Sequence, residues 1–267
     1  TEAMVRCIVE SGILPDGAIQ LVCGSIGDLF DHLGGQDHVG FTGSAATAAA
    51  LRAHPNLVGR SVRFNAEADS LNAAILGPSA VPGTTEFDLF VAEVAREMTV
   101  KAGQKCTAIR RVLVPAVHVD AAAEAIATTL SGTRVGDPAD EATGMGSLVG
   151  TTQRDEAAAA IAALRTAARV VVDSCTFHDV DPTAGAFLAP TLLLATDSEA
   201  PVIHATEAFG PVATLVAYDG PDEAVRLAGL GEGSLVASIY SGDPDEAATI
   251  ALGIAAHHGR VHVVDAS

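Results

Sequence analysis

Short apolar segments of strand length alternate with segments of helical periodicity along almost the whole chain of 267 residues. This alternation constrains the fold most, because a parallel strand needs a long crossover connection, which is usually a helix. The sequence therefore predicts an α/β fold with largely parallel sheets. The chain is long enough to bury a sizeable core. Aromatic residues make up only 4% of it and Trp is absent, so Ala, Val, Leu and Ile are expected to fill that core.

Apolar patterns and turn residues set the expected elements. Strands are predicted at 18–23, 38–42, 61–66, 72–76, 108–115, 169–173, 187–194, 211–218, 235–240 and 260–264. Helices are predicted at 2–10, 45–53, 117–130, 153–168, 221–229 and 243–256, with a short one opened by Gly24 and Gly27. The clearest helix begins at a variant capping box, Thr85 to Asp88, and we expect it to end at Gly103. Its apolar stripe comprises Phe87, Phe90, Val91, Val94, Ala95 and Met98.

Charge and cysteine usage exclude several classes of protein. A net charge of −18 argues against nucleic-acid binding, since phosphates are repelled by most of such a surface. No apolar run reaches the roughly 18 residues of a membrane helix, and no secretory signal is visible. The four cysteines form no C-x-x-C pair or zinc-type spacing, so we expect a reduced, cytoplasmic protein without a metal site. Cys7, Cys23 and Cys175 are expected to be small core residues.

One stretch gathers positive charge around a thiol. Residues 101–111, KAGQKCTAIRR, contain both lysines of the chain, two of its thirteen arginines and Cys106. Nearby cations stabilise a thiolate, which is the nucleophilic form of cysteine. Two interpretations stand at this point: a reactive thiol, or a basic patch on a turn beside a core cysteine.

Other candidate groups are weaker signals. Glu67 lies between two predicted strands, where a carboxylate can act as a general base or simply face solvent. Gly24 and Gly27 follow a predicted strand, and Gly43 with Ser44 precedes a predicted helix. Helix N-termini of this kind can bind phosphate, although neither is a full G-x-G-x-x-G motif.

Taken together, these stretches resemble the aldehyde dehydrogenase superfamily. The matching pieces are GILPDGAIQLVCG (12–24), VGFTGSAATA (39–48), Glu67, GQKCTAIRR (103–111), VGDP (135–138) and EAFGPVATL (207–215). NAEADSLN and GQKCTAIRR resemble one branch in particular. That branch holds the aldehyde dehydrogenase portion of the bifunctional phenylacetyl-CoA ring-opening protein and related CoA-linked semialdehyde dehydrogenases.

The resemblance implies a role for each matching residue. Cys106 would attack the aldehyde carbon, and Glu67 would activate the water that hydrolyses the resulting thioester. The implied cofactor is NADP or NAD, and the implied substrate is a small aldehyde, CoA-linked in this branch. The residues implied at the cofactor are Gly24, Gly43, Ser44, Ala68, Glu207 and Phe209.

The resemblance also implies an architecture, a three-layer α/β/α arrangement in two parts. Residues 1–68 would be the C-terminal half of a Rossmann-type nucleotide-binding domain, and 69–267 a catalytic domain lacking its C-terminal end. The chain would then be a piece of a longer protein, homo-oligomeric as family members usually are. Two alternatives remain: free CoA attacks the thioester in place of water, or these residues alone are catalytically incompetent.

Overall fold

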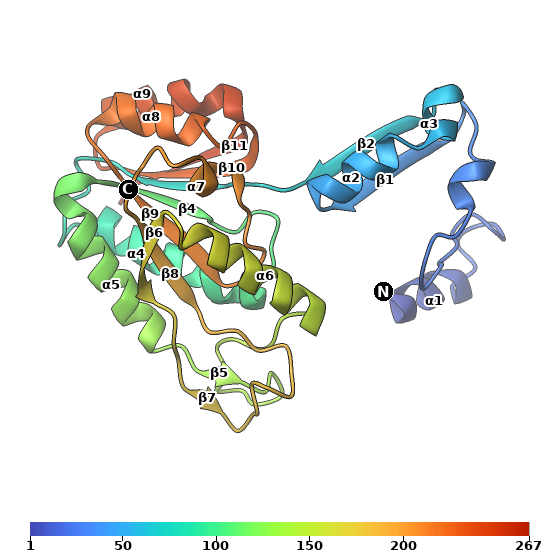
Figure 1. Cartoon of the computed structure of the whole chain (residues 1–267), viewed down its shortest axis with the longest axis horizontal. Coiled ribbons are helices and arrows are strands. Elements are labelled where there is room, and N and C mark those ends of the chain that lie inside the picture. Colours follow the sequence, from blue (N-terminus) through green and yellow to red (C-terminus); the bar gives the residue numbers. More distant parts are fainter. Residues whose placement is uncertain (267) are drawn as a thin grey trace. The chain divides into compact units, whose positions relative to one another are not determined.

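The computed structural model describes residues 1–266 (Figure 1). The chain forms two compact units, the first from Thr1 to Ala68 and the second from Asp69 onward. Each unit has its own hydrophobic core. Within residues 1–266, no helix combines the length and the apolar character that crossing a membrane requires.

The first unit is built around two parallel strands. Its elements are α1 (Glu2–Glu10), a 3₁₀ helix (Leu29–His32), β1 (His38–Gly43), α2 (Ala45–Arg52), α3 (Pro55–Gly59) and β2 (Arg63–Ala68). β1 and β2 pair in parallel, with Thr42 opposite Glu67 and Gly43 opposite Ala68. The buried core is small and comprises Phe30, Leu57 and Val62.

The second unit contains the main sheet. Its strands run in the order β11 (His258–Val264), β10 (Ser234–Tyr240), β3 (Ala73–Leu76), β4 (Arg111–Pro115), β9 (Val212–Tyr218), β8 (Thr191–Ala195) and β6 (Ala168–Val172). All neighbours pair in parallel except β6, which runs antiparallel to β8. The predicted, largely parallel α/β fold class is therefore confirmed. β5 (Val135–Gly136) and β7 (Phe177–His178) form a separate short pair.

Helices cover both faces of this sheet. One layer is formed by α4 (Thr85–Thr99) and α5 (Val119–Ser131), and the other by α6 (Thr151–Leu164), α7 (Pro201–Ala205), α8 (Pro221–Gly229) and α9 (Pro244–Ile254). Because side chains alternate along a strand, Ala74 and Leu76 pack with the first layer, whereas Ala73 and Ile75 pack with the second. The result is three layers, α/β/α (Figure 1).

The predicted strand at 18–23 is wrong. These residues form turns and extended loop, and Val22 is 71% exposed. A strand needs a hydrogen-bonded neighbour, and the sheet of the first unit consists of β1 and β2. The expected core positions of Cys7 and Cys23 are also wrong, because both residues are exposed, Cys7 on α1 and Cys23 in the loop, whereas Cys175 packs against a small core cluster.

Other differences are shifts of element boundaries. α4 is capped by the Thr84 side chain, which accepts from the Phe87 amide, one residue before the predicted box. α4 ends at Thr99 rather than Gly103, and β2 extends to Ala68, so Glu67 lies within a strand. The helix predicted after Gly24 is a 3₁₀ turn that begins at Leu29. The sequence pattern missed α3, α7, β5 and β7, each no longer than five residues.

Candidate functional site

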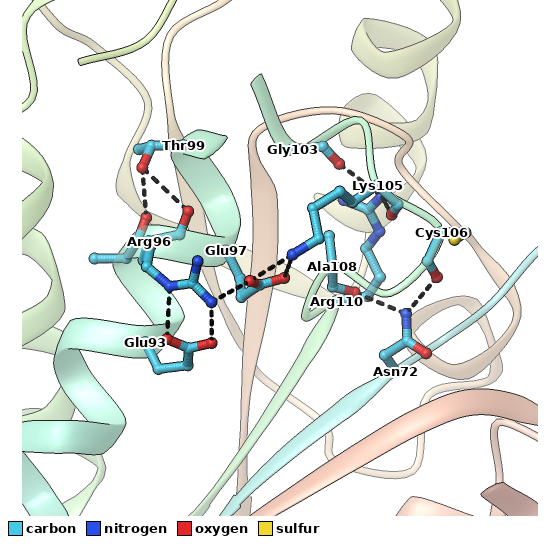
Figure 2. Close-up of polar contacts among 11 residues, drawn as sticks. Asn72, Glu93, Arg96, Glu97, Thr99, Gly103, Lys105, Cys106, Ala108 and Arg110 are labelled. Atoms are coloured by element: carbon cyan, nitrogen blue, oxygen red, sulfur yellow. Dashed lines mark hydrogen bonds and ion pairs between the residues drawn. The ribbon is translucent and has the colours of Figure 1, made fainter. Parts of the chain in front are cut away.

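The candidate residues of the second unit lie at one edge of its sheet. β3, β4 and β9 are adjacent and parallel, so the amino-terminal ends of these three strands lie side by side at the same end of the sheet. Segments 69–72, 103–110 and 206–211 lead directly into these three strands. Cys106 belongs to the middle segment, residues 103–110 (Figure 2), which we call the nucleophile loop after the role that the sequence resemblance predicts for Cys106.

An unusual backbone leads into the nucleophile loop. Lys101, Ala102 and Gly103 have φ values of 54°, 52° and 69°, three consecutive left-handed residues. For the two that are not glycine, this conformation costs roughly 1–2 kcal/mol each. A Cβ on Gly103 would come 2.0 Å from the Gly210 carbonyl oxygen, so only glycine fits there. The nucleophile loop is therefore packed directly against the backbone of the 206–211 segment.

Asn72 holds the other side of the nucleophile loop. It is fully buried, and its Nδ2 donates to the carbonyls of Cys106 at 2.8 Å and Ala108 at 2.9 Å (Figure 2). Its Oδ1 accepts from Ser70 Oγ at 2.7 Å and from the Val236 amide at 3.0 Å. One amide side chain thus fixes the turn that carries the exposed Cys106.

The basic residues around Cys106 have different surroundings. Lys105 Nζ donates to both carboxylate oxygens of Glu97 at 2.7 Å, and Arg96 donates to Oε1 of the same carboxylate at 3.0 Å (Figure 2). The Glu97 side chain is only 6% exposed. The positive charge of Lys105 is therefore balanced by a buried carboxylate on α4, rather than offered to the thiol alone.

Arg111 is buried and its role is structural. It makes five hydrogen bonds, to the carbonyls of Leu71 (two bonds), Leu227 and Ala228 and to Nδ1 of His204. Burial lowers the pKa of Arg111 to about 10, which leaves it protonated at neutral pH. Because His204 Nδ1 faces a donor, its proton is assigned to Nε2, which donates to the Ser198 carbonyl at 2.7 Å.

Arg110 connects the nucleophile loop to Glu207 and Phe209. Its guanidinium donates to the carbonyls of Gly103 at 2.9 Å and Gly210 at 2.8 Å. Its Nε lies 3.5 Å from Glu207 Oε1, an ion-pair distance, and its Cζ lies 5.3 Å from the centre of the Phe209 ring. Two segments distant in sequence, the nucleophile loop and residues 206–211, therefore meet at one buried cation.

Glu207 is a carboxylate that can accept a further hydrogen bond. The Ser70 amide donates to its Oε2 at 3.2 Å, whereas Oε1 is buried without a hydrogen-bond partner among residues 1–266. Burial raises the pKa of Glu207, and the neighbouring Arg110 opposes that shift. Glu207 lines a cavity of about 430 Å³ together with Asp69, His204 and Glu232. The contact of Oε1 is therefore the ion pair with Arg110, at 3.5 Å from Nε.

A second cavity, of about 500 Å³, adjoins the nucleophile loop. Its lining includes Lys101, Gln104, Val149 and Phe209. The Gln104 side chain accepts from the Val149 amide at 2.8 Å, which ties the loop to the segment before α6. Phe209 is 41% exposed, so one face of its ring remains available to a bound molecule.

In the first unit, the candidate residues gather at the carboxyl ends of β1 and β2. Glu67 and Ala68 end β2, and Gly43 and Ser44 lie at the end of β1 and the start of α2. Ser44 caps α2 by accepting from the Thr47 amide at 3.2 Å. The carboxyl ends of parallel strands are where ligands usually bind in open α/β sheets.

The remaining sequence candidates behave differently. Gly24 lies apart from any strand, exposed in a loop, with a φ of 136°. Residues 1–266 contain no cluster of His, Cys, Asp or Glu that could hold a metal ion. Asn72 and the role of Arg110 were missed by sequence reasoning, because nothing near them in sequence indicates their partners.

The family-level comparison identifies the family to which the chain just described belongs. Residues 1–266 match the model of the aldehyde dehydrogenase family, so the chain belongs to that family. The resemblance predicted from the sequence is therefore confirmed.

Two curated relatives show how much of a family member the chain represents. 3,4-Dehydroadipyl-CoA semialdehyde dehydrogenase of Aromatoleum evansii is 52% identical over 270 residues, which cover 100% of this chain and 52% of that protein. Geranial dehydrogenase of Castellaniella defragrans is 31% identical, over 93% of this chain and 50% of that protein. The chain thus spans about half the length of the curated relatives it matches.

Solved structures agree with the fold. An apo mutant of betaine aldehyde dehydrogenase from Staphylococcus aureus matches with a TM-score of 0.84 and 25% identity, over 98% of this chain and 51% of that one. A double mutant of the same enzyme, in complex with NAD⁺ and with a BME-modified cysteine, matches with a TM-score of 0.83 and 25% identity, over 98% and 52%.

Proposed function

We propose that the full-length protein containing this chain oxidises a CoA-linked semialdehyde to the carboxylic acid, with NADP or NAD as the hydride acceptor. The observation that carries the proposal is the 52% identity, across the whole chain, to a protein named as a CoA-semialdehyde dehydrogenase. The geometry of the nucleophile loop supports it, since Cys106 is an exposed thiol on a turn fixed from both sides.

In this proposal Cys106 forms the covalent intermediate. Its thiolate adds to the aldehyde carbon, and the carbonyl oxygen becomes an oxyanion that the Cys106 backbone N–H can stabilise. The nicotinamide cofactor, when bound, accepts the hydride from that carbon. What remains on Cys106 is a thioester, which is activated toward attack by a nucleophile.

Glu67 is proposed as the general base for hydrolysis. Its carboxylate would take a proton from water as the water oxygen adds to the thioester carbonyl. Collapse of the tetrahedral adduct expels the Cys106 thiolate and releases the acid. Glu67 and Cys106 belong to different units of the chain, so their pairing rests on the family resemblance.

Several residues are proposed to hold the cofactor. Glu207 lines a cavity of the second unit, and its carboxylate would accept a hydrogen bond from a ribose hydroxyl. Phe209 would pack against the nicotinamide, since its ring is partly exposed beside a cavity. Gly43 and Ser44 would lie at the pyrophosphate, where the amides at the start of α2 favour anionic groups. Gly24 and Ala68 are assigned to the cofactor by resemblance alone.

The test uses the full-length gene product and a CoA-linked semialdehyde. NAD(P)H formation is followed by absorbance, with C106S as the inactive control. In E67Q we expect one burst of NAD(P)H and a stalled acyl-enzyme detectable by intact mass. If free CoA restores turnover in E67Q, the acceptor is CoA and the enzyme is acylating. Unchanged turnover of E67Q would remove Glu67 from the mechanism. Residues 1–267 alone, assayed in parallel, are expected to be inactive because they cover about half of the relatives.

A further inference from the structure

Arg110 occupies a position between the two parts of the site in the second unit. Its side chain is 3% exposed, and it contacts three groups in three directions. Nη2 donates to the carbonyls of Gly103 at 2.9 Å and Lys105 at 3.3 Å, which flank the approach to Cys106. Figure 2 shows these contacts on the inner side of the nucleophile loop.

The other two groups lie on the segment before β9. Nη1 donates to the Gly210 carbonyl at 2.8 Å, and Nε faces Glu207 Oε1 at 3.5 Å. The guanidinium also lies 5.3 Å from the centre of the Phe209 ring, within the range of a cation–π contact. A planar guanidinium with donors on three nitrogens can span these positions, whereas a lysine offers a single nitrogen.

We propose that Arg110 is a positioning residue that fixes the Glu207 carboxylate for the cofactor ribose and ties it to the nucleophile loop. This inference rests on the proposed function, because it takes Glu207 to be a ligand of NAD(P)⁺. The new element is that one buried cation, Arg110, sets the position of both the cofactor and Cys106.

The charges around Glu207 define what Arg110 must balance. Burial is the largest influence and raises the pKa of Glu207, and the nearby Asp69 acts in the same direction. Arg110 and the Ser70 amide lower it. Glu199, Glu232 and His204 line the same cavity. Among the groups that shift the pKa of Glu207, Arg110 is therefore the cation that favours the ionised form.

The experiment compares R110M, R110K, E207Q and R110M/E207Q in the full-length enzyme, with R165M as a control for loss of an exposed arginine. We expect R110M to raise KM for NAD(P)⁺ about tenfold, with a much smaller change in kcat. In the E207Q background, R110M should add less than about a threefold further increase, since the two residues act through one contact.

The pH profile separates positioning from a general loss of structure. Without Arg110, Glu207 becomes protonated at higher pH, so the acidic limb of kcat/KM for the cofactor should move to higher pH in R110M. R110K keeps the charge and should return that limb toward its wild-type position, while restoring KM only in part. Thermal unfolding of each variant shows whether it is folded at the assay temperature.

The outcomes distinguish a failure of the proposed function from a failure of the role proposed for Arg110. If the wild-type protein oxidises no aldehyde, the proposed function fails. If the wild-type is active and R110M leaves both KM for NAD(P)⁺ and the acidic limb unchanged, the role of Arg110 fails. If R110M unfolds, R110K and E207Q still decide the question: a wild-type acidic limb and KM in E207Q would show that Glu207 is not the group that Arg110 positions.

Discussion

Replacing Lys105 should destabilise the fold much more than it alters the reactivity of the adjacent thiol. Lys105 Nζ donates to both oxygens of Glu97 at 2.7 Å, and the Glu97 side chain is only 6% exposed. In K105M, Glu97 remains a buried carboxylate, and the ion pair that it keeps among residues 1–266 is the one with Arg96, at 3.0 Å. Arg96 is 55% exposed, so its contact is screened by water and compensates only partly.

The magnitude follows from the burial of Glu97. Removing one partner of a buried ion pair typically costs 3–5 kcal/mol, and the remaining Arg96 contact should reduce this to about 2–3 kcal/mol. The exposed pair formed by Arg96 and Glu93 gives the contrast, since such pairs contribute less than about 1 kcal/mol. Replacing both Lys105 and Glu97 with methionine should recover at least about 1 kcal/mol relative to the sum of the single changes.

Urea unfolding at neutral pH, followed by circular dichroism, measures these differences. E93Q is the matched control, because it removes the Arg96–Glu93 pair and leaves both cationic partners of Glu97 in place. Iodoacetamide labelling with peptide mapping across pH then reports on Cys106 in the folded variants. We expect K105M to lower the urea midpoint clearly while the pH midpoint of labelling shifts by less than about half a unit. A K105M midpoint equal to that of E93Q would refute the reasoning about the buried carboxylate. A large shift in labelling would show that Lys105 acts on the thiol after all.

Two further predictions concern the backbone and a buried histidine. G103A should lose at least about 3 kcal/mol of stability and most activity. The new Cβ would come 2.0 Å from the Gly210 carbonyl oxygen, and the φ of this residue is 69°. A urea midpoint and an activity like those of the wild type would contradict the close approach. Burial lowers the pKa of His204, so the unfolded state binds more protons than the folded state at mildly acidic pH. The stabilisation is present above the ordinary pKa of about 6.5 and is lost as pH falls through the folded-state pKa. H204Q should flatten this decline in urea midpoints between pH 7 and pH 5; an unchanged slope would assign the decline to other groups such as His258.

The spacing of apolar residues predicted those helices and strands whose buried face recurs at regular positions in the sequence. The stripe of α4 shows this well, since Phe90, Val94 and Met98 are all buried against the sheet. β4 was predicted as residues 108–115, and the strand itself is shorter, Arg111–Pro115. Such elements follow from sequence because their buried face is set by residues three, four or two positions apart.

Contacts across the chain were beyond the sequence pattern. The segment 18–23 has the composition of a strand, but pairing depends on a neighbour that the pattern cannot supply. The left-handed conformations of Lys101 and Ala102 are equally hidden, because neither residue type favours positive φ. Asn72 reads as an ordinary polar residue before a strand until the carbonyls it binds, 34 and 36 residues away, are known.

The concentration of positive charge around Cys106 has a different explanation from the one its sequence suggests. A cluster of cations beside a cysteine indicates a stabilised thiolate only when those charges face the sulfur. Here Lys105 is paired with Glu97, Arg111 is enclosed by carbonyls, and Arg110 faces Glu207. Lys105 and Arg110 hold the nucleophile loop to α4 and to the segment 206–211, and Arg111 holds the start of β4 to the carbonyls around it. None of these contacts requires the thiol. Charges that are adjacent to Cys106 in sequence therefore need not act on its sulfur. The K105M and R110M variants measure how much of their effect is on the fold and how much is on the site.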